Sequence, residues 1–188
     1  MKKKILSAAV LAAMGVGSAQ AVNLSQDGTG EVLIFPYYTT NGGHKTLISV
    51  VNTTNDTKAV KVRFREGMNS REVLDFNLYL SPEDVWTGSV QEGADGGAIL
   101  KTIDTSCTVP AIPATGVAFV DYAYADHDND GITGNGSTYD GGPETIDRTR
   151  EGYVEIIEMG IEDKTDISVA PFALDAAGLG SGWHAVWD

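Results

Sequence analysis

The stretch "KAVKVRFRE" (residues 58–66) decides the fold class, because its apolar and charged side chains alternate. The apolar positions are Val60, Val62 and Phe64, and the charged positions are Lys61, Arg63 and Arg65. A period of two is typical of a strand with one buried face and one solvated face. The sequence therefore predicts a half-buried β-strand at this point.

Further runs with a period near two extend along most of the chain. They are rich in β-branched and aromatic residues, and turn-forming residues separate them at intervals of about 8 to 12 positions. The predicted strands cover residues 31–40, 45–52, 71–80, 85–90, 98–103, 116–124 and 152–159. We find no long amphipathic helical pattern. The expected fold is all-β, an antiparallel β-sandwich of the immunoglobulin-like type, with one long acidic loop inserted.

Two local features refine this expectation. The segment "TTNDT" (residues 53–57) separates two predicted strands, and its Asn and Asp residues favour a hairpin loop. In the run 71–80, the apolar residues on one face are Leu74, Phe76, Leu78 and Leu80. We expect these four side chains to enter the core.

The N-terminus has the pattern of a secretory signal peptide, namely three lysines, a short apolar run and a small-residue site ending in Ala21. We therefore assign residues 1–21 to a signal peptide and 22–188 to a single β-sandwich domain, which could be the N-terminal part of a longer chain. The expected location is the periplasm, the cell surface or the extracellular medium. We expect no membrane insertion once the signal peptide is removed.

The charge balance excludes one class of partner. The whole chain has a formal net charge of −13, and without Lys2, Lys3 and Lys4 it has 10 basic against 26 acidic residues, a net charge of −16. Such a surface repels polyanions. We therefore expect no binding to nucleic acid.

The segment "DHDNDGITG" (residues 126–134) is the candidate metal site. Calcium prefers six to eight oxygen ligands, and carboxylates at alternate loop positions can surround it when a glycine allows a sharp turn. Asp126, Asp128 and Asp130 match the first three ligand positions of an EF-hand loop, and the carbonyl of Ile132 matches the fourth. These residues predict a calcium site.

The match to an EF-hand is incomplete. Ser137 stands where a bidentate glutamate is expected, and flanking helices are not predicted. A looser calcium loop would need a further carboxylate from nearby, for which we take Asp140 first; the other candidates are Asp121, Glu144 and Asp147. The alternative is an acidic surface turn that binds no metal.

Catalytic patterns are sparse. Three histidines are present, and the sequence has no HExxH, nucleophile-elbow, phosphate-loop or dinucleotide-binding motif. With 26 acidic residues, a pair of neighbouring carboxylates would arise by chance, so it does not indicate a glycosidase. We predict a non-enzymatic protein.

Tyr122 and Tyr124 are the candidate ligand-binding residues, because they alternate on a predicted strand that leads directly into the acidic segment. Exposed aromatic rings stack on sugars, so these two would make the chain a carbohydrate-binding module. The alternative is that both rings pack within the fold.

Two further features bear on partners. The charged face of residues 58–66 either pairs with acidic residues of neighbouring strands or docks on the acidic surface of a second copy. Cys107 is the only cysteine, so it forms no disulfide within this chain. It is either an inert thiol or a link to another chain.

Taken together, "TLISVVNTTNDTKAVKVRFREG", "VLDFNLYLSPEDVW" and "EGYVEIIEMG" resemble a group of uncharacterised, signal-peptide-bearing proteins of Gram-negative bacteria. The segment "LISVVNTTNDTKAVKVRF" is also similar to hairpins of bacterial immunoglobulin-like surface domains. The resemblance covers residues 31–160 and implies a secreted β-sandwich. It transfers no catalytic residue.

The sequence thus predicts an exported, non-enzymatic structural or interaction domain of the cell envelope or surface, stabilised by calcium. Its partners would be other envelope or surface proteins or further copies of itself. The alternative is a carbohydrate-binding module that binds a glycan through aromatic residues near the acidic segment.

Overall fold

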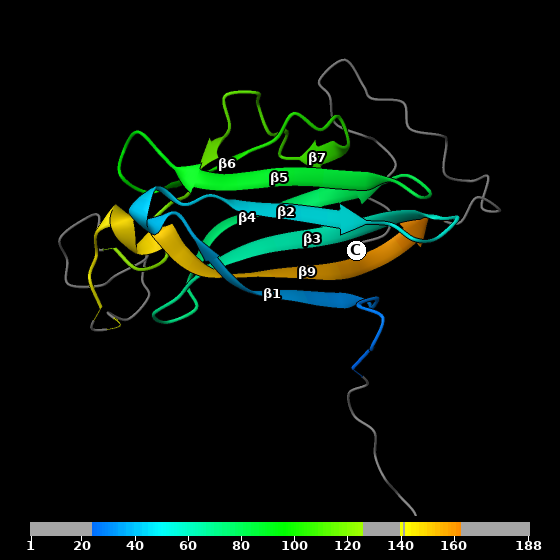
Figure 1. Cartoon of the computed structure of the whole chain (residues 1–188), viewed down its shortest axis with the longest axis horizontal. Helices are drawn as coiled ribbons and strands as arrows, with labels where there is room; N and C mark the ends of the chain where they lie inside the picture. Colours follow the sequence, from blue (N-terminus) through cyan, green and yellow to red (C-terminus); the bar gives the residue numbers. More distant parts are fainter. Residues whose placement is uncertain (1–23, 126–139, 141, 163–188) are drawn as a thin grey trace, which may run out of the picture. The chain divides into compact units, whose positions relative to one another are not determined.

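The computed structural model describes residues 24–125, 140 and 142–162 (Figure 1). The chain divides into two units, Met1–Gly30 and Glu31–Asp188. In the first unit, the described residues 24–30 are exposed and contain no strand. Within the described residues, all nine strands lie in the second unit, and no helix is long and apolar enough to cross a membrane.

The nine strands form two antiparallel sheets that are not closed into a barrel. Sheet A has five strands in the order β1 (Val32–Thr39), β9 (Glu151–Glu162), β3 (Thr57–Glu66), β4 (Glu72–Leu80) and β7 (Cys107–Val109). Sheet B has four strands in the order β2 (Thr46–Val51), β5 (Val85–Glu92), β6 (Ala98–Lys101) and β8 (Val117–Ala118). Two 3-10 turns, η1 (Asn41–Gly43) and η2 (Ile146–Arg150), complete the described elements. The all-β prediction is confirmed, and the arrangement is consistent with a β-sandwich.

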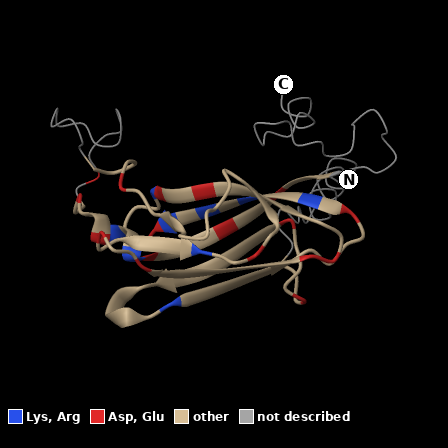
Figure 2. Ribbon diagram, turned by 90° about the horizontal axis from the view of Figure 1, so that it is seen from above, with Lys and Arg blue, Asp and Glu red and all other residues tan. Residues whose placement is uncertain are grey.

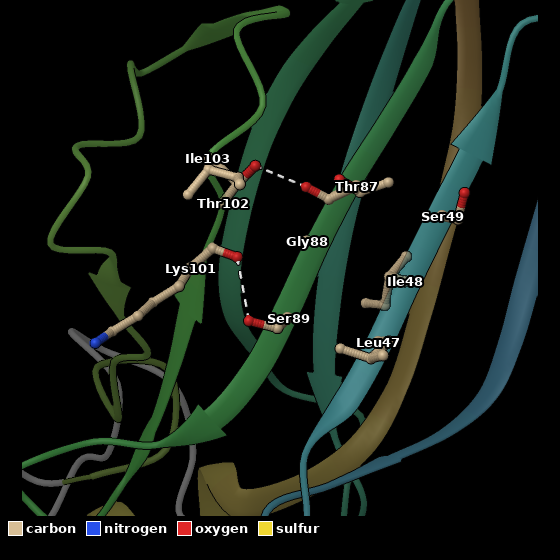
Figure 3. Close-up of a pocket in the computed structure, with 9 residues that line it drawn as sticks. All are labelled: Leu47, Ile48, Ser49, Thr87, Gly88, Ser89, Lys101, Thr102 and Ile103. Carbon is tan, nitrogen blue, oxygen red and sulfur yellow. Dashed lines mark hydrogen bonds between the residues drawn. The ribbon is translucent and has the colours of Figure 1, made fainter.

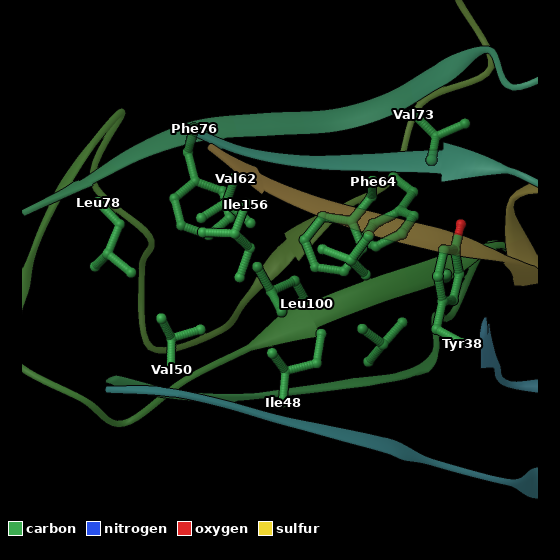
Figure 4. Close-up of a cluster of buried hydrophobic side chains, with 14 of the residues drawn as sticks. Tyr38, Ile48, Val50, Val62, Phe64, Val73, Phe76, Leu78, Leu100 and Ile156 are labelled. Carbon is green, nitrogen blue, oxygen red and sulfur yellow. The ribbon is translucent and has the colours of Figure 1, made fainter. Parts of the chain in front are cut away.

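One hydrophobic core joins the two sheets (Figure 4). Sheet A contributes Val62, Phe64 and Phe76, and sheet B contributes Ile48 and Leu100, all nearly inaccessible to solvent. Ring contacts rigidify one part of this core, where Phe64 lies 5.0 Å from Phe119 between ring centroids. Burial of this apolar surface from both sheets is the main force that holds them face to face.

The stretch 58–66 forms β3 with the predicted alternation, since Val60, Val62 and Phe64 are buried and the basic residues between them are only partly exposed. The neighbouring strand β4 departs from the prediction in one place. A register shift between β3 and β4 turns Val73 into the core, and Leu74 is only partly buried. The bulge at this end of β4 is the physical reason, because an extra residue reverses the facing of the side chains beyond it.

The prediction of a hairpin at residues 53–57 is wrong. The strands on either side, β2 and β3, belong to different sheets, so the segment is a connection between sheets. The buried Asn52 holds it there: its side-chain amide donates to the carbonyls of Asp56 at 2.7 Å and Ser81 at 2.8 Å, and its oxygen accepts from the N–H of Thr54. Asn52 thereby joins this connection to the residue that follows β4.

The strand predicted at residues 116–124 is also much shorter than expected, since β8 ends at Ala118. The chain then leaves sheet B: the Phe119 N–H still donates to the Ala98 carbonyl of sheet B, whereas the Val120 N–H donates to the Val73 carbonyl of sheet A. A turn follows, in which Tyr124 and Ala125 both donate to the carbonyl of Asp121. The chain therefore crosses between the sheets here instead of continuing along one of them.

Candidate functional site

The most extensive buried polar cluster of the described residues lies at the base of the acidic segment. It centres on Arg148 of η2, whose Nε donates to Glu66 Oε2 at 2.8 Å and whose Nη2 donates to Glu66 Oε1 at 3.1 Å. Arg148 Nη1 also donates to Asp140 Oδ1 at 3.1 Å. The side chains of Arg148, Glu66 and Asp140 are 2%, 0% and 3% exposed. An arginine thus bridges two buried carboxylates from distant parts of the sequence.

Glu66, the last residue of β3, is satisfied on both carboxylate oxygens. Besides Arg148, it accepts backbone N–H bonds from Met68 at 2.7 Å, Asn69 at 3.0 Å and Arg71 at 2.8 Å. Burial on its own would raise the pKa of Glu66, but the hydrogen bonds from Arg148 and these backbone groups outweigh it and hold the pKa below its ordinary value. Glu66 therefore stays ionised and fixes the turn between β3 and β4.

Asp140 is the second carboxylate of the cluster. Its Oδ1 accepts the Gly142 N–H at 2.9 Å, and its Oδ2 accepts from the side chain of Asn69 at 3.3 Å. The hydrogen bonds from Arg148 hold the pKa of Asp140 well below its usual range, and those to Asp140 and Glu66 raise the pKa of Arg148. A carboxylate whose pKa is this low is a poor general base near neutral pH. The cluster is suited to anchoring the chain, not to proton transfer.

Arg148 contacts the chain on both sides of residues 126–139. On the C-terminal side it binds Asp140. On the N-terminal side its guanidinium carbon lies 4.4 Å from the centroid of the Tyr124 ring. Tyr124 is itself held by a hydrogen bond from its hydroxyl to the Thr145 carbonyl at 3.1 Å. The two ends of the acidic segment are therefore fixed to one buried side chain.

The predicted site residues have different positions in this arrangement. Asp126, Asp128, Asp130 and Ile132 lie outside the described residues. Asp140 is described and lies in the Arg148 cluster. Within the described residues, no three histidine, cysteine or acidic side chains are grouped so that they could hold a metal ion.

The two predicted ligand-binding tyrosines are not equivalent. Tyr124 is 1% exposed, and burial raises the pKa of its hydroxyl. Tyr122 is 53% exposed. Both belong to the turn that follows the sheet crossing, not to a strand. Of the two rings, only that of Tyr122 is accessible to a ligand.

Glu66 and Arg148 were not among the residues selected from the sequence. The position of Glu66 contained a usable signal, because it continues the alternate positions of Val62 and Phe64 and so falls on the buried face of β3. A carboxylate on a buried face requires a cationic or hydrogen-bonding partner. Nothing in the sequence pattern indicated which of the basic residues that partner would be.

The basic face of β3 is paired across the strands of sheet A. Lys61 binds Asp75, Arg63 Nε lies 2.7 Å from Glu72 Oε2, and Arg65 Nε lies 2.8 Å from an oxygen of Glu155. Figure 2 shows basic and acidic segments side by side on neighbouring strands. These pairs match the first of the two predicted alternatives and neutralise most of the positive charge that would attract an acidic surface.

An open groove of about 420 Å³ lies on sheet B and on the chain that follows β6 (Figure 3). Its walls combine the apolar side chains of Leu47 and Ile103 with the hydroxyls of Ser49 and Thr87, and Lys101 is the only charged residue in its lining. No aromatic side chain lines it, so it lacks the flat apolar surface on which a sugar ring stacks.

Comparisons of the chain with models of protein families, with curated proteins and with solved structures found no match.

Proposed function

We propose that the chain is an exported, non-enzymatic structural or interaction domain of the cell envelope or surface, in which the acidic segment binds calcium. Export is supported by the signal-peptide pattern of residues 1–21. The proposal includes an immunoglobulin-like type for the sandwich, which is supported by two wholly antiparallel sheets around one core. Other envelope or surface proteins are the proposed partners.

The observation that carries the calcium proposal is the fixed base of the acidic segment. Arg148 contacts Tyr124 before the segment and Asp140 after it, so the chain ends that enter and leave residues 126–139 are already ordered. A site with fixed ends loses less conformational entropy when it closes around an ion. A loop of like charges on such a base gains from a cation that neutralises it.

The cluster also refines the proposed ligand set. Each oxygen of Asp140 accepts a hydrogen bond from Arg148. A calcium ion would therefore have to compete with the guanidinium for this carboxylate. We therefore assign the ion to Asp126, Asp128, Asp130 and the carbonyl of Ile132. Asp140 anchors the segment from which these ligands extend.

The test is a thermal melt of the protein in EDTA and in about 5 mM calcium. With an affinity typical of extracellular calcium modules, about 0.1 mM, linkage gives about 2 kcal/mol of stabilisation. For a domain of this size we expect Tm to rise by about 5 to 9 °C. Magnesium should have a much smaller effect, because it requires a tighter octahedral site.

Two variants complete the calcium test. Asp128→Ala should abolish the shift, whereas Asp75→Ala removes a carboxylate of sheet A and should leave the shift intact. If the wild-type protein shows no shift, residues 126–134 are an acidic turn and the calcium proposal fails.

The second candidate function is glycan binding, which is favoured by the exposure of Tyr122 next to the acidic segment. A glycan that stacks on this ring should change tyrosine fluorescence, and Tyr122→Ala should remove the response. Since Tyr124 is buried beneath Arg148, Tyr124→Phe should bind the same glycan as the wild-type protein. A glycan array with no signal would eliminate this candidate.

A further inference from the structure

The four edges of the two sheets differ in how they are protected from pairing with another chain. An edge strand exposes unpaired N–H and C=O groups, and proteins block such edges with short strands, proline, bulges or charges. In sheet A, the edge strand β7 has three residues, and β1 contains Pro36 and a register shift between Phe35 and Tyr38. In sheet B, the edge strand β8 has two residues. Three of the four edges are therefore blocked in known ways.

The fourth edge, strand β2, has none of these features. Its sequence TLISVV has no proline and no charged residue, and its six residues pair with β5 in an unbroken register. Within the described residues, no strand pairs with its other side. β-branched residues, low charge and a regular backbone are the properties that allow a strand to accept a further strand.

The hydrogen bonds of β2 show which of its backbone groups face outwards. The Asn52 N–H donates to the Asp84 carbonyl of the β5 side, and in an antiparallel pair the facing of these groups alternates. The backbone N–H and C=O groups of Ile48 and Val50 therefore face β5. The N–H and C=O groups of Leu47, Ser49 and Val51 face the open edge.

Side chains at the same three positions are exposed on the outer face of sheet B. Leu47 is 79% exposed, Val51 is 51% exposed and Ser49 is exposed between them. Leu47 and Ser49 also line the groove of sheet B (Figure 3). The edge thus combines backbone groups that pair with no other described strand and two apolar side chains that a neighbouring strand would cover.

We propose that β2 pairs with β2 of a second copy of this chain, antiparallel and about a two-fold axis at Ser49. The two four-stranded sheets B would then join into one continuous sheet. In this register Ser49 lies opposite Ser49 of the partner subunit. Leu47 lies opposite Val51 of the partner subunit, and Val51 lies opposite Leu47 of the partner subunit. It forms about six hydrogen bonds between the chains, all from groups that face the open edge.

The absence of charge on β2 allows a second copy of this acidic chain to be the occupant. The chain has a net charge of −13, so two copies repel each other over most of their surfaces. The strand β2 has no charged side chain, and no acidic residue lines the groove beside it. Contact through this edge therefore adds no like-charge pair within the strands, and an apolar side chain meets an apolar one.

The size of the contact sets the expected affinity. Two six-residue strands form an interface at the lower end of the known range, below about 1,200 Å². We expect a reversible dimer with a dissociation constant of about 1 to 100 μM. This surface contains no residue of the Arg148 cluster, and the inference rests on the proposed function only in that both describe an interaction domain. A calcium-induced rise in Tm without a dimer would separate the two.

Sedimentation velocity of the purified protein tests the proposal. Samples between about 1 and 500 μM should change from one copy to two. A reducing agent must be present, because Cys107 is exposed and free and could otherwise link two copies. Ser49→Lys places two like charges opposite each other on the axis, and it should raise the dissociation constant at least about ten-fold.

Two further variants make the result specific. Thr87→Lys puts the same charge on the exposed outer face of β5, directly beside Ser49 but away from the edge, and the dimer should persist. A mixture of Ser49→Lys and Ser49→Glu chains should form a heterodimer about as tightly as the wild-type protein forms its dimer. This rescue requires the two positions to face each other.

Three outcomes would overturn the proposal. One is a wild-type protein that stays monomeric throughout, because another segment or a different partner then occupies the edge. Another is a dimer that survives Ser49→Lys, which would locate the contact elsewhere. The third is equal loss of the dimer in Ser49→Lys and Thr87→Lys, which would indicate the outer face of sheet B instead of its edge.

Discussion

Arg148 shows how one side chain can contact both ends of a segment that precedes it in the sequence. Its guanidinium binds two buried carboxylates and lies over the ring of Tyr124. Burying an ion pair costs desolvation energy, and excellent geometry with further hydrogen bonds is needed to offset that cost. The backbone N–H bonds to Glu66 and Asp140 meet this condition. Removing the arginine would leave two buried carboxylates without a cation.

We predict that Arg148→Met destabilises the protein by about 3 to 5 kcal/mol at pH 7, because methionine retains much of the volume but leaves Glu66 and Asp140 uncompensated. Urea denaturation followed by circular dichroism measures the loss. The control is Arg63→Met on the outer face of sheet A, where an exposed pair with Glu72 contributes at most about 1 kcal/mol. Equal effects in both variants would refute the role of Arg148 as an anchor.

The sequence allowed part of this site to be predicted. Asp140, selected as a metal ligand, and Tyr124, selected as a ligand-binding residue, both contact Arg148, whereas residues 126–130 lie outside the described residues. The pairing of Glu66 with Arg148 spans 82 positions, and no local pattern specifies a contact at that separation. For Tyr124, the buried ring matches the alternative that the aromatic side chains pack within the fold.

At the level of elements, β9 is the strand on which sheet A depends, because it pairs with β1 on one side and β3 on the other. Gly152 lies where the three strands meet, opposite Tyr38 and Glu66. A Cβ atom added to Gly152 would lie 1.9 Å from the carbonyl oxygen of Arg65. Backbone atoms cannot move aside as a flexible side chain can, so this position accepts only glycine.

Gly152→Ala should therefore cost about 3 kcal/mol or more, by forcing β9 away from the end of β3. Gly160→Ala is the matched control on the same strand, because nothing lies within 4 Å of the added atom. We expect the control to stay within about 0.5 kcal/mol of the wild-type protein or to be slightly more stable. Thermal melts compare the two, and a similar Tm for both would contradict the close packing at Gly152.

Alternation along the sequence predicts strands well but not the sheet to which each strand belongs. The alternation predicted both β3 and β4 as strands, and in the structure the short turn between them joins them as an antiparallel pair of sheet A. The link between β2 and β3 is of similar length and polarity, yet it crosses between sheets. The difference lies in Asn52, whose hydrogen bond to Ser81 comes from 29 positions away. Period and turn composition contain no information about such a contact.

At the level of the whole molecule, three carboxyl groups of the described residues link stability to pH. The pKa values of Glu66, Asp104 and Asp140 are all lowered in the folded protein. For Asp104, burial opposes this shift and hydrogen bonds from Ser106 and Thr87 cause it. A group whose pKa is lower when folded stabilises the fold above its unfolded pKa, and that contribution is lost as the pH falls through the folded pKa. All three groups act in the same direction.

The free energy of unfolding should therefore be nearly constant from about pH 8 to pH 5 and should fall progressively below about pH 4.5. Protonation of other carboxylates also reduces the repulsion within this acidic chain, and this opposes the loss of stability at low pH. Comparison with a variant isolates the contribution of Glu66 to the free energy of unfolding. Glu66→Gln keeps the shape but not the charge of Glu66, and it should be less stable than the wild-type protein at pH 7. The difference should shrink as the pH falls below about 4.5, because Glu66 takes up a proton in the unfolded state at a higher pH than in the folded state. Urea titrations at pH 7, 5, 4 and 3 measure both proteins, and a difference that stays constant with pH would show that the charge of Glu66 does not stabilise the fold.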